Sequence, residues 1–230
     1  MIRFENVYKE YPGGNEALHD VDLHIKRGEF VFVLGPSGAG KSTFLKLILR
    51  EESPTRGHVW VDGVDLADLK EKQIPYLRRK IGVVFQDFRL IPTMTVYDNV
   101  AFALRVTDVS EDRIRERVPI VLKLVGLTHK ADAYPPTLSG GEQQRVAVGH
   151  ALAHSPELLI ADEPTGNVHP AMSLEMMKLL VAANNVGTTV VVVTHEQDMA
   201  RRMGKRIILL EEGRVVTDGK PGQCKGGARG

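Results

Sequence analysis

Lys41 and Ser42 end a glycine-rich stretch whose residue types suit phosphate binding. Residues 35–42 read GPSGAGKS and match the pattern GxxxxGK[ST]. Glycines let the backbone curl so that several N–H groups point at phosphate oxygens. Lys41 is expected to reach the β- and γ-phosphates, and the Ser42 hydroxyl to ligate Mg²⁺. The expected nucleotide-binding residues are Gly35, Pro36, Ser37, Gly38, Ala39, Gly40, Lys41, Ser42 and Thr43. The alternative is a glycine-rich turn that merely caps a helix.

Two carboxylates, Asp162 and Glu163, follow the apolar run 158–161. Open α/β sheets bind ligands at the carboxyl ends of their strands, so this position indicates a functional pair. Asp162 suits an outer partner of Mg²⁺, and Glu163 suits the base that activates water for attack on the γ-phosphorus. The alternative is an ordinary polar strand exit, which the pairing with the Lys41 loop disfavours.

Buried strands must position these groups. Residues 30–34 are continuously apolar, as expected for a parallel strand covered on both faces, and they lead through the glycine loop into a helical stretch at 42–50. Similar apolar runs recur at 81–85, 158–161 and 189–193, with helix-length segments between them. We therefore predict an α/β fold with a parallel core sheet.

The flanking segments differ from this core. Residues 1–30 alternate apolar and polar side chains, which predicts an N-terminal antiparallel β subdomain. Residues 87–136 carry apolar side chains at helical spacing, which predicts an inserted helical subdomain. A last strand pair is expected at 206–211 and 214–217, so the domain spans 1–218 and residues 219–230 form a flexible glycine-rich tail.

Composition excludes several classes of protein. The 230 residues are 43% hydrophobic and carry a formal net charge of +1, which argues against binding nucleic acid by bulk charge. The single cysteine, Cys224, permits no internal disulfide. The first residues lack the pattern of a signal peptide, and no apolar run approaches the length of a membrane span. A cytoplasmic location is therefore expected.

Residues 138–145, LSGGEQQR, resemble the signature motif of ATP-binding-cassette (ABC) ATPases. The pattern Ser139-x-x-Glu142 is also a capping box, and the two interpretations are compatible. The resemblance implies a P-loop NTPase fold of the ABC nucleotide-binding type. It also implies that ATP bound to one copy meets Ser139, Gly140, Gly141 and Glu142 of a second copy, in a head-to-tail homodimer.

Three further residues match this family by their order in the chain. Tyr11 resembles the aromatic residue that stacks on adenine, although a tyrosine in a turn is more often a surface residue. Gln86 resembles the glutamine that senses Mg²⁺ and the attacking water, and His195 resembles the histidine that contacts the γ-phosphate. The resemblance thus implies catalytic roles for Glu163, Gln86 and His195 and a Mg²⁺ site of Ser42, Gln86 and Asp162.

Two positions depart from the family pattern. His169 stands where an aspartate is usual, and we hypothesise that it weakens hydrolysis or the coupling between the two sites, or makes either pH-dependent. Gly149-His150 stands where Ala-Arg is common. His150 and His154 have the spacing of a metal pair, but packed or solvated histidines are the favoured interpretation because no third ligand is obvious.

Residues 84–90 and 95–102, together with Arg78-Arg79 and residues 140–146, are similar to the cell-division branch of the ABC family. That resemblance implies an integral membrane partner whose cytoplasmic helix docks near residues 86–99. It also implies a location on the inner face of the membrane at the division site, and an output that controls cell-wall hydrolases. Two alternatives remain open: the ATPase of an amino-acid importer or a lipoprotein or macrolide exporter, and a nucleotide-gated scaffold with little turnover.

Overall fold

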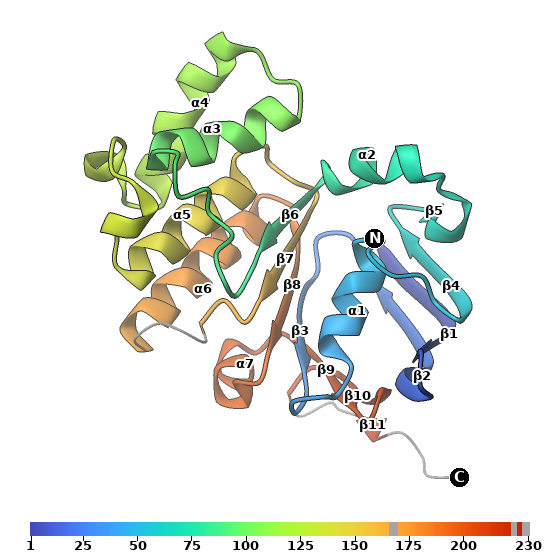
Figure 1. Ribbon diagram of the computed structural model, residues 1–230. Coiled ribbons are helices and arrows are strands. Elements are labelled where there is room, and N and C mark those ends of the chain that lie inside the picture. The colour runs from blue at the N-terminus through green and yellow to red at the C-terminus, as the bar shows by residue number, and fades with distance from the viewer. Residues whose placement is uncertain (166–169, 222–224, 227–230) are drawn as a thin grey trace. The chain divides into compact units, whose positions relative to one another are not determined.

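The structure, a computed structural model, describes residues 1–165, 170–221 and 225–226 (Figure 1). Its internal contacts divide the chain into two compact units. One comprises Met1–Arg78 together with Val191–Gly230, and the other comprises Arg79–Val190. The boundary at 190/191 falls inside strand β8 (Thr189–Thr194), all of whose residues are buried.

An antiparallel sheet opens the first unit. Its strand order is β2-β1-β4-β5, with the strands β1 (Ile2–Tyr11), β2 (Asn15–Ile25), β4 (Arg56–Val61) and β5 (Val64–Asp65). Ile2 lies opposite Ile25 on one side and Val61 on the other, and all three side chains are fully or almost fully buried. The predicted antiparallel strands of the first thirty residues are thereby confirmed.

The β4–β5 hairpin lies outside the strands predicted from the sequence. Asp62 and Gly63 link its two strands, and both have positive φ, 54° and 79°. Positive φ at both central residues is the geometry of a type I′ turn, for which Asp-Gly is a favoured pair. The dipeptide, followed and preceded by valines, was the signal that could have predicted this hairpin.

A second set of strands in the first unit has the order β11-β10-β9-β3. The bounds are β3 (Phe30–Leu34), β9 (Arg206–Glu211), β10 (Arg214–Gly219) and β11 (Lys225–Gly226). β3 and β9 pair in parallel, and every residue of β3 is buried, as predicted. β11 pairs with β10 inside the segment predicted to be a flexible tail, and the mobility of that segment stays a prediction.

The helices of the first unit are α1 (Lys41–Ile48), α2 (Ile74–Arg78) and α7 (Gln197–Met203), with 3₁₀ turns at Leu66–Asp68 and Glu71–Gln73. α1 packs against β2 and β4. The ring of Phe4 on β1 stacks on that of Phe44 on α1, with centroids 4.8 Å apart. This aromatic contact helps to fix α1, and hence the glycine loop before it, on the antiparallel sheet.

The second unit contains the parallel strands β6 (Ile81–Val84) and β7 (Leu158–Asp162). Its helices are α3 (Val96–Val106), α4 (Glu111–Leu124), α5 (Gly140–Leu152) and α6 (Pro170–Asn185), with 3₁₀ turns at Thr128–Lys130 and Pro135–Thr137. α5 packs against α3, α4, α6 and β6 (Figure 1). α3 and α4 lie within the segment predicted as a helical subdomain, although the division of the chain into subdomains stays a prediction.

Membrane-spanning helices were searched for among the described residues. In that part of the chain, no helix combines the length and the apolar character that a bilayer crossing requires.

Candidate functional site

The glycine loop joins β3 to α1 in the order predicted from the sequence. Gly38 and Gly40 have φ of 80° and 99°, a backbone region that other residues enter at a cost, and Gly40 forms the N-cap of α1. A Cβ on Gly40 would lie 2.4 Å from the carbonyl oxygen of Ala17. Glycine is therefore required at this position by the neighbouring strand as well as by φ.

Lys41 lies inside the curve of this loop. Its ammonium donates to the carbonyl oxygens of Gly35 at 2.6 Å and of Pro36 at 3.0 Å. Ser42 in the first turn of α1 is exposed. The loop thus places a cation and a hydroxyl at a helix N-terminus, where N–H groups and the helix dipole favour an anion.

Tyr11 lies beside the start of α1. Its hydroxyl is 3.4 Å from the hydroxyl of Thr43, which is buried, and the ammonium of Lys9 lies 4.9 Å from the centre of the Tyr11 ring. Lys9 occupies one side of the ring, and it is itself held by Glu52. The structure therefore brings Tyr11 to the phosphate loop, and its stacking on adenine stays a prediction.

In the second unit, Gln86 and Asp162 line one open hollow. β6 and β7 run in parallel with Val84 opposite Ala161, so both chains leave the sheet at the same edge. The hollow has a volume of about 360 Å³ and is lined by Phe85, Gln86, Asp87, Arg89 and Asp162. The predicted glutamine and the predicted aspartate therefore line the same hollow at this edge of the sheet.

Glu163 follows Asp162 with a backbone φ of 44°. A left-handed conformation is uncommon for a residue with a long side chain and costs roughly 1 kcal/mol or more. Such strain concentrates at functional sites, where the surrounding structure maintains it. Glu163 is one of ten described non-glycine residues with positive φ, and its role as the base stays a prediction.

The donor groups of the predicted Mg²⁺ site fit that ion. Gln86 and Asp162, which line one hollow, carry an amide and a carboxylate, and Ser42, described in the other unit, carries a hydroxyl. Mg²⁺ prefers oxygen ligands and is usually held by few protein groups together with water and phosphate oxygens. Among the residues that the structure describes, no cluster of three or more His, Cys, Asp or Glu could hold a metal alone. The set is therefore suited to an ion that arrives with a nucleotide.

The predicted capping box at Ser139 is present. The Ser139 hydroxyl accepts the N–H of Glu142 at 3.3 Å, and the Glu142 carboxylate accepts the Ser139 N–H at 2.8 Å. These bonds, chiefly the one from the Ser139 backbone, lower the pKa of Glu142. Ser139 and Gly140 are exposed, and a Cβ on Gly141 would lie 3.0 Å from the terminal carbon of Met172. The turn is held by reciprocal hydrogen bonds and is accessible, and an exposed helix N-terminus of this kind favours an anion.

His195 follows β8 and is exposed. The backbone N–H of Glu196 donates to the Thr194 hydroxyl at 3.2 Å, which fixes the chain around it before α7 begins. His195 belongs to the same unit as the Lys41 loop. Its contact with a γ-phosphate stays a prediction. The other unusual histidine, His169, lies outside the described residues.

His150 and His154 are packed. His150 Nδ1 lies 2.8 Å from the backbone oxygen of Asn99, and burial lowers the pKa of its ring. Both ring nitrogens of His154 are buried and have no hydrogen-bond partner among the described residues. Burial, with a smaller contribution from His150, lowers the pKa of His154 to about 4.

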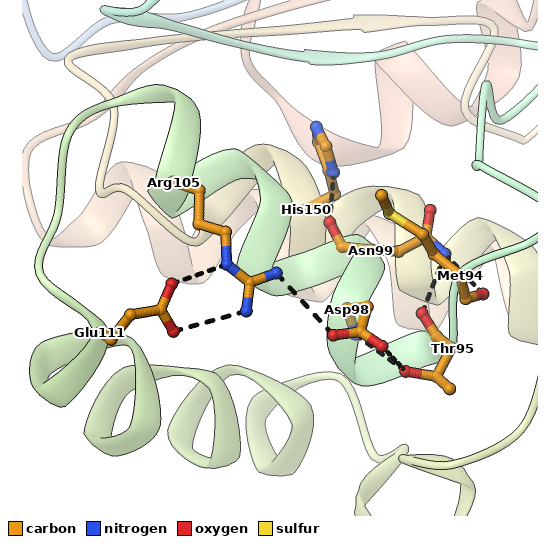
Figure 2. A network of polar contacts seen from close by, with 7 residues as sticks. All are labelled: Met94, Thr95, Asp98, Asn99, Arg105, Glu111 and His150. Carbon is orange, nitrogen blue, oxygen red and sulfur yellow. Dashed lines mark hydrogen bonds and ion pairs between the residues drawn. The ribbon is translucent and has the colours of Figure 1, made fainter.

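One buried polar residue on α3 was not predicted from the sequence as a functional residue. Asn99 on α3 is 1% exposed, and Figure 2 shows its amide beside Met94 and Thr95. The same network includes Arg105, which donates to Glu111 at 2.8 Å, and Asp98, which accepts from the Thr95 hydroxyl at 2.8 Å. An asparagine at an apolar position of a helix was the signal in the sequence that could have pointed to it.

Comparison with known proteins gives consistent matches over nearly the whole chain. A family model described as ABC transporter matches residues 18–166. Cell division ATP-binding protein FtsE of Bacillus subtilis (strain 168) is 53% identical over 97% of this chain and 98% of its own length, and that of Escherichia coli (strain K12) is 47% identical over 94% and 97%. A dimeric structure of the ATP-binding cassette MJ0796 in a post-hydrolysis state, bound to ADP and Pi, superposes with a TM-score of 0.87 at 42% identity, covering 96% of this chain and 98% of that one.

Proposed function

Because the chain belongs to the ABC transporter family, we propose that it is the ATP-hydrolysing subunit of a cell-division complex, in which two copies act on an integral membrane partner. The predicted family, α/β fold class and ATPase activity are confirmed by the family match, the FtsE relatives and the cassette structures. The partner resembles FtsX, the membrane protein implied by the resemblance to FtsE. The chain is then peripheral on the inner face of the membrane at the division site.

One observation carries the proposed chemistry. The carboxyl ends of the parallel strands β6 and β7 place Gln86 and Asp162 around one hollow, with Glu163 next in the chain in a left-handed backbone conformation. An amide, a carboxylate for a metal and a carboxylate for a base are the groups that phosphoryl transfer to water requires. The Lys41 loop supplies the phosphate-binding half of the same reaction.

The reaction proceeds by positioning and charge stabilisation. Backbone N–H groups of residues 38–41 and the Lys41 ammonium bind the β- and γ-phosphates, and the ammonium then exchanges the carbonyls of Gly35 and Pro36 for phosphate oxygens. Glu163 accepts a proton from the attacking water, and Gln86 orients that water. Ser42, Asp162 and Gln86 would hold Mg²⁺, which would neutralise charge on the phosphates.

Ser139 supplies the other half of each pocket. Its exposed turn at the N-terminus of α5 offers N–H groups to the γ-phosphate held by a second copy. Binding of two ATP molecules then closes a head-to-tail dimer, and loss of the γ-phosphate opens it. Closing and opening move the membrane partner, which controls cell-wall hydrolases outside the membrane.

Substitution of the proposed base tests the activity. Glu163→Gln keeps the size of the side chain and removes its basicity, so we expect kcat for ATP to fall by ~10² to 10⁴-fold while ATP affinity stays within about twofold. Phosphate release and equilibrium binding of a fluorescent ATP analogue measure the two quantities. Glu157→Gln, an exposed carboxylate just before β7, is the matched control, and Lys41→Ala is the blank. Wild-type turnover in Glu163→Gln would exclude Glu163 as the base.

A transporter ATPase is the second candidate function. It is favoured by the 43% identity and TM-score of 0.88 to a structure described as a bacterial ABC transporter cassette. Purification from membranes separates the two candidates. An FtsX-like protein bound to the tagged chain supports the cell-division function, whereas a substrate-conducting permease supports transport.

A further inference from the structure

The side-chain amide of Asn99 fastens the loop that precedes α3. Its Oδ1 accepts the N–H of Ile91 at 2.8 Å. Its Nδ2 donates to the carbonyl oxygens of Ile91 at 3.1 Å, Met94 at 3.1 Å and Thr95 at 2.9 Å, so the two N–H groups are shared among three acceptors. Figure 2 shows Asn99 with two of these partners, Met94 and Thr95. A buried amide with every donor and acceptor engaged is a rigid anchor, because each lost bond leaves a buried polar group unpaired.

The anchored loop is the one that carries Gln86. Only residues 87–90 separate Gln86 from Ile91, and two of them, Phe88 and Arg89, have positive φ of 62° and 48°. Two consecutive non-glycine residues in the left-handed region require outside restraint. The Arg89 guanidinium lies 3.8 Å from the centre of the Phe85 ring, which restrains the first end of the loop. Asn99 restrains the second end.

Asn99 is itself fastened to the helix that begins at Ser139. The backbone oxygen of Asn99 lies 2.8 Å from Nδ1 of His150 on α5. A carbonyl oxygen only accepts, so the ring donates, and its tautomer carries the proton on Nδ1. A Cβ on the neighbouring Gly149 would lie 3.3 Å from Val121 of α4, which shows how tightly α5 is packed at this point. The hydrogen bond from His150 and the close packing of α5 therefore hold the backbone of Asn99 in place.

We propose that Asn99 is a positioning residue for hydrolysis, which holds Gln86 in the hollow beside Asp162 by fixing residues 91–95 against α3. This inference deepens the proposed function and rests on it. Asn99 touches neither nucleotide nor water in this role. It fixes the position of Gln86. A small displacement of the group that orients the attacking water is enough to slow hydrolysis strongly.

Proteolysis tests the anchor without reference to activity. Trypsin cleaves after Arg89, whose side chain is exposed, only when the loop opens. In the full-length chain under native conditions, we expect Asn99→Ala to raise the rate of cleavage at Arg89–Leu90 by ~10-fold or more relative to wild type. Mass spectrometry identifies the cut. Asn99→Asp keeps the acceptor for Ile91 but loses the donors, and it provides a second variant of nearly equal volume if the alanine variant folds poorly.

Thr95→Ala is the matched control. It removes the hydroxyl that caps α3 through the N–H of Asp98, yet leaves the Thr95 carbonyl and the whole Asn99 amide in place. General weakening of α3 should therefore affect both variants, whereas opening of the loop should be confined to the Asn99 variants. Equal cleavage at Arg89 in Thr95→Ala and in both Asn99 variants would overturn the proposal.

Kinetics tests whether the anchor acts through Gln86. We expect Asn99→Asp to lower kcat for ATP by ~10-fold or more with KM within about twofold. In a chain that already carries Gln86→Ala, the same substitution should lower kcat by less than about twofold further, because the group it positions is gone. Full additivity of the two losses would overturn the role. The absence of wild-type turnover above the Lys41→Ala blank would refute the proposed function instead, and the proteolysis result would then stand alone.

Discussion

The two ring nitrogens of His154 have no hydrogen-bond partner among the described residues. Both of these nitrogens are buried. His150 on α5, four residues earlier, instead donates its Nδ1 N–H to the backbone oxygen of Asn99. A ring that cannot be solvated resists protonation, which is why the pKa of His154 falls to about 4. The HxxxH spacing thus belongs to two packed side chains, one on α5 and the other just beyond its C-terminal end.

Stability should depend on pH through His154. Its folded pKa lies below the unfolded value of about 6.5, so between pH 6.5 and 4 the unfolded chain binds a proton that the folded chain does not. We expect this group to lower the free energy of unfolding by up to about 1.4 kcal/mol per pH unit as pH falls through that window. Urea midpoints measured from pH 7 to pH 5 provide the test.

His154→Leu should reduce that dependence, because the non-titrating side chain removes the contribution of His154 and leaves that of His150, whose pKa burial also lowers. The matched control, His129→Leu, changes an exposed histidine and should keep the wild-type slope. Parallel pH profiles for wild type and His154→Leu would contradict the assignment.

Among the elements, α5 depends most clearly on its first turn. Ser139 and Glu142 exchange hydrogen bonds there, whereas Ser110, which occupies the same N-cap position on α4, makes no side-chain capping bond. The two serines therefore occupy matching positions and make different contributions.

We expect Ser139→Ala to lower the free energy of unfolding by about 1 kcal/mol, and Ser110→Ala by a few tenths at most. Chemical denaturation of the two variants side by side measures the difference. Equal losses of the free energy of unfolding in the two variants would mean that the hydrogen bonds of the capping box at Ser139 do not stabilise α5. The Ser139 variant should also hydrolyse ATP more slowly, since its turn is proposed to meet the nucleotide of the second copy.

At the scale of the whole molecule, the proposal requires two copies for each reaction. Glu163→Gln, which binds ATP without hydrolysing it, should migrate at twice the 25.4 kDa mass of the chain in Mg²⁺ and ATP, and as a monomer in Mg²⁺ and ADP. Light scattering coupled to gel filtration gives the masses. Adding Ser139→Arg to the same variant places a bulky side chain at the exposed turn and should abolish the ATP-dependent dimer. A monomer under all three conditions would refute the head-to-tail arrangement.

The sequence alone predicted what local chemistry determines. The glycine loop requires positive φ at Gly38 and Gly40, the Ser139 cap bonds within four residues, and runs such as 30–34 are apolar because both faces of a strand are covered. Each feature depends on residues that are close together in the sequence, so the sequence alone predicts it. The β4–β5 hairpin was equally local, and its Asp-Gly turn was simply missed.

Only the tertiary structure determined which residues far apart in the sequence lie close together. Gln86 and Asp162 line one hollow because parallel strands far apart in the sequence end at one edge, and Gly40 is crowded by Ala17 because α1 begins against β2. Asn99 is a helical asparagine in the sequence and an anchor in the fold, since its partners include a loop before α3 and a histidine 51 residues further on. Long-range packing fixes such contacts, and no spacing rule along the chain specifies them.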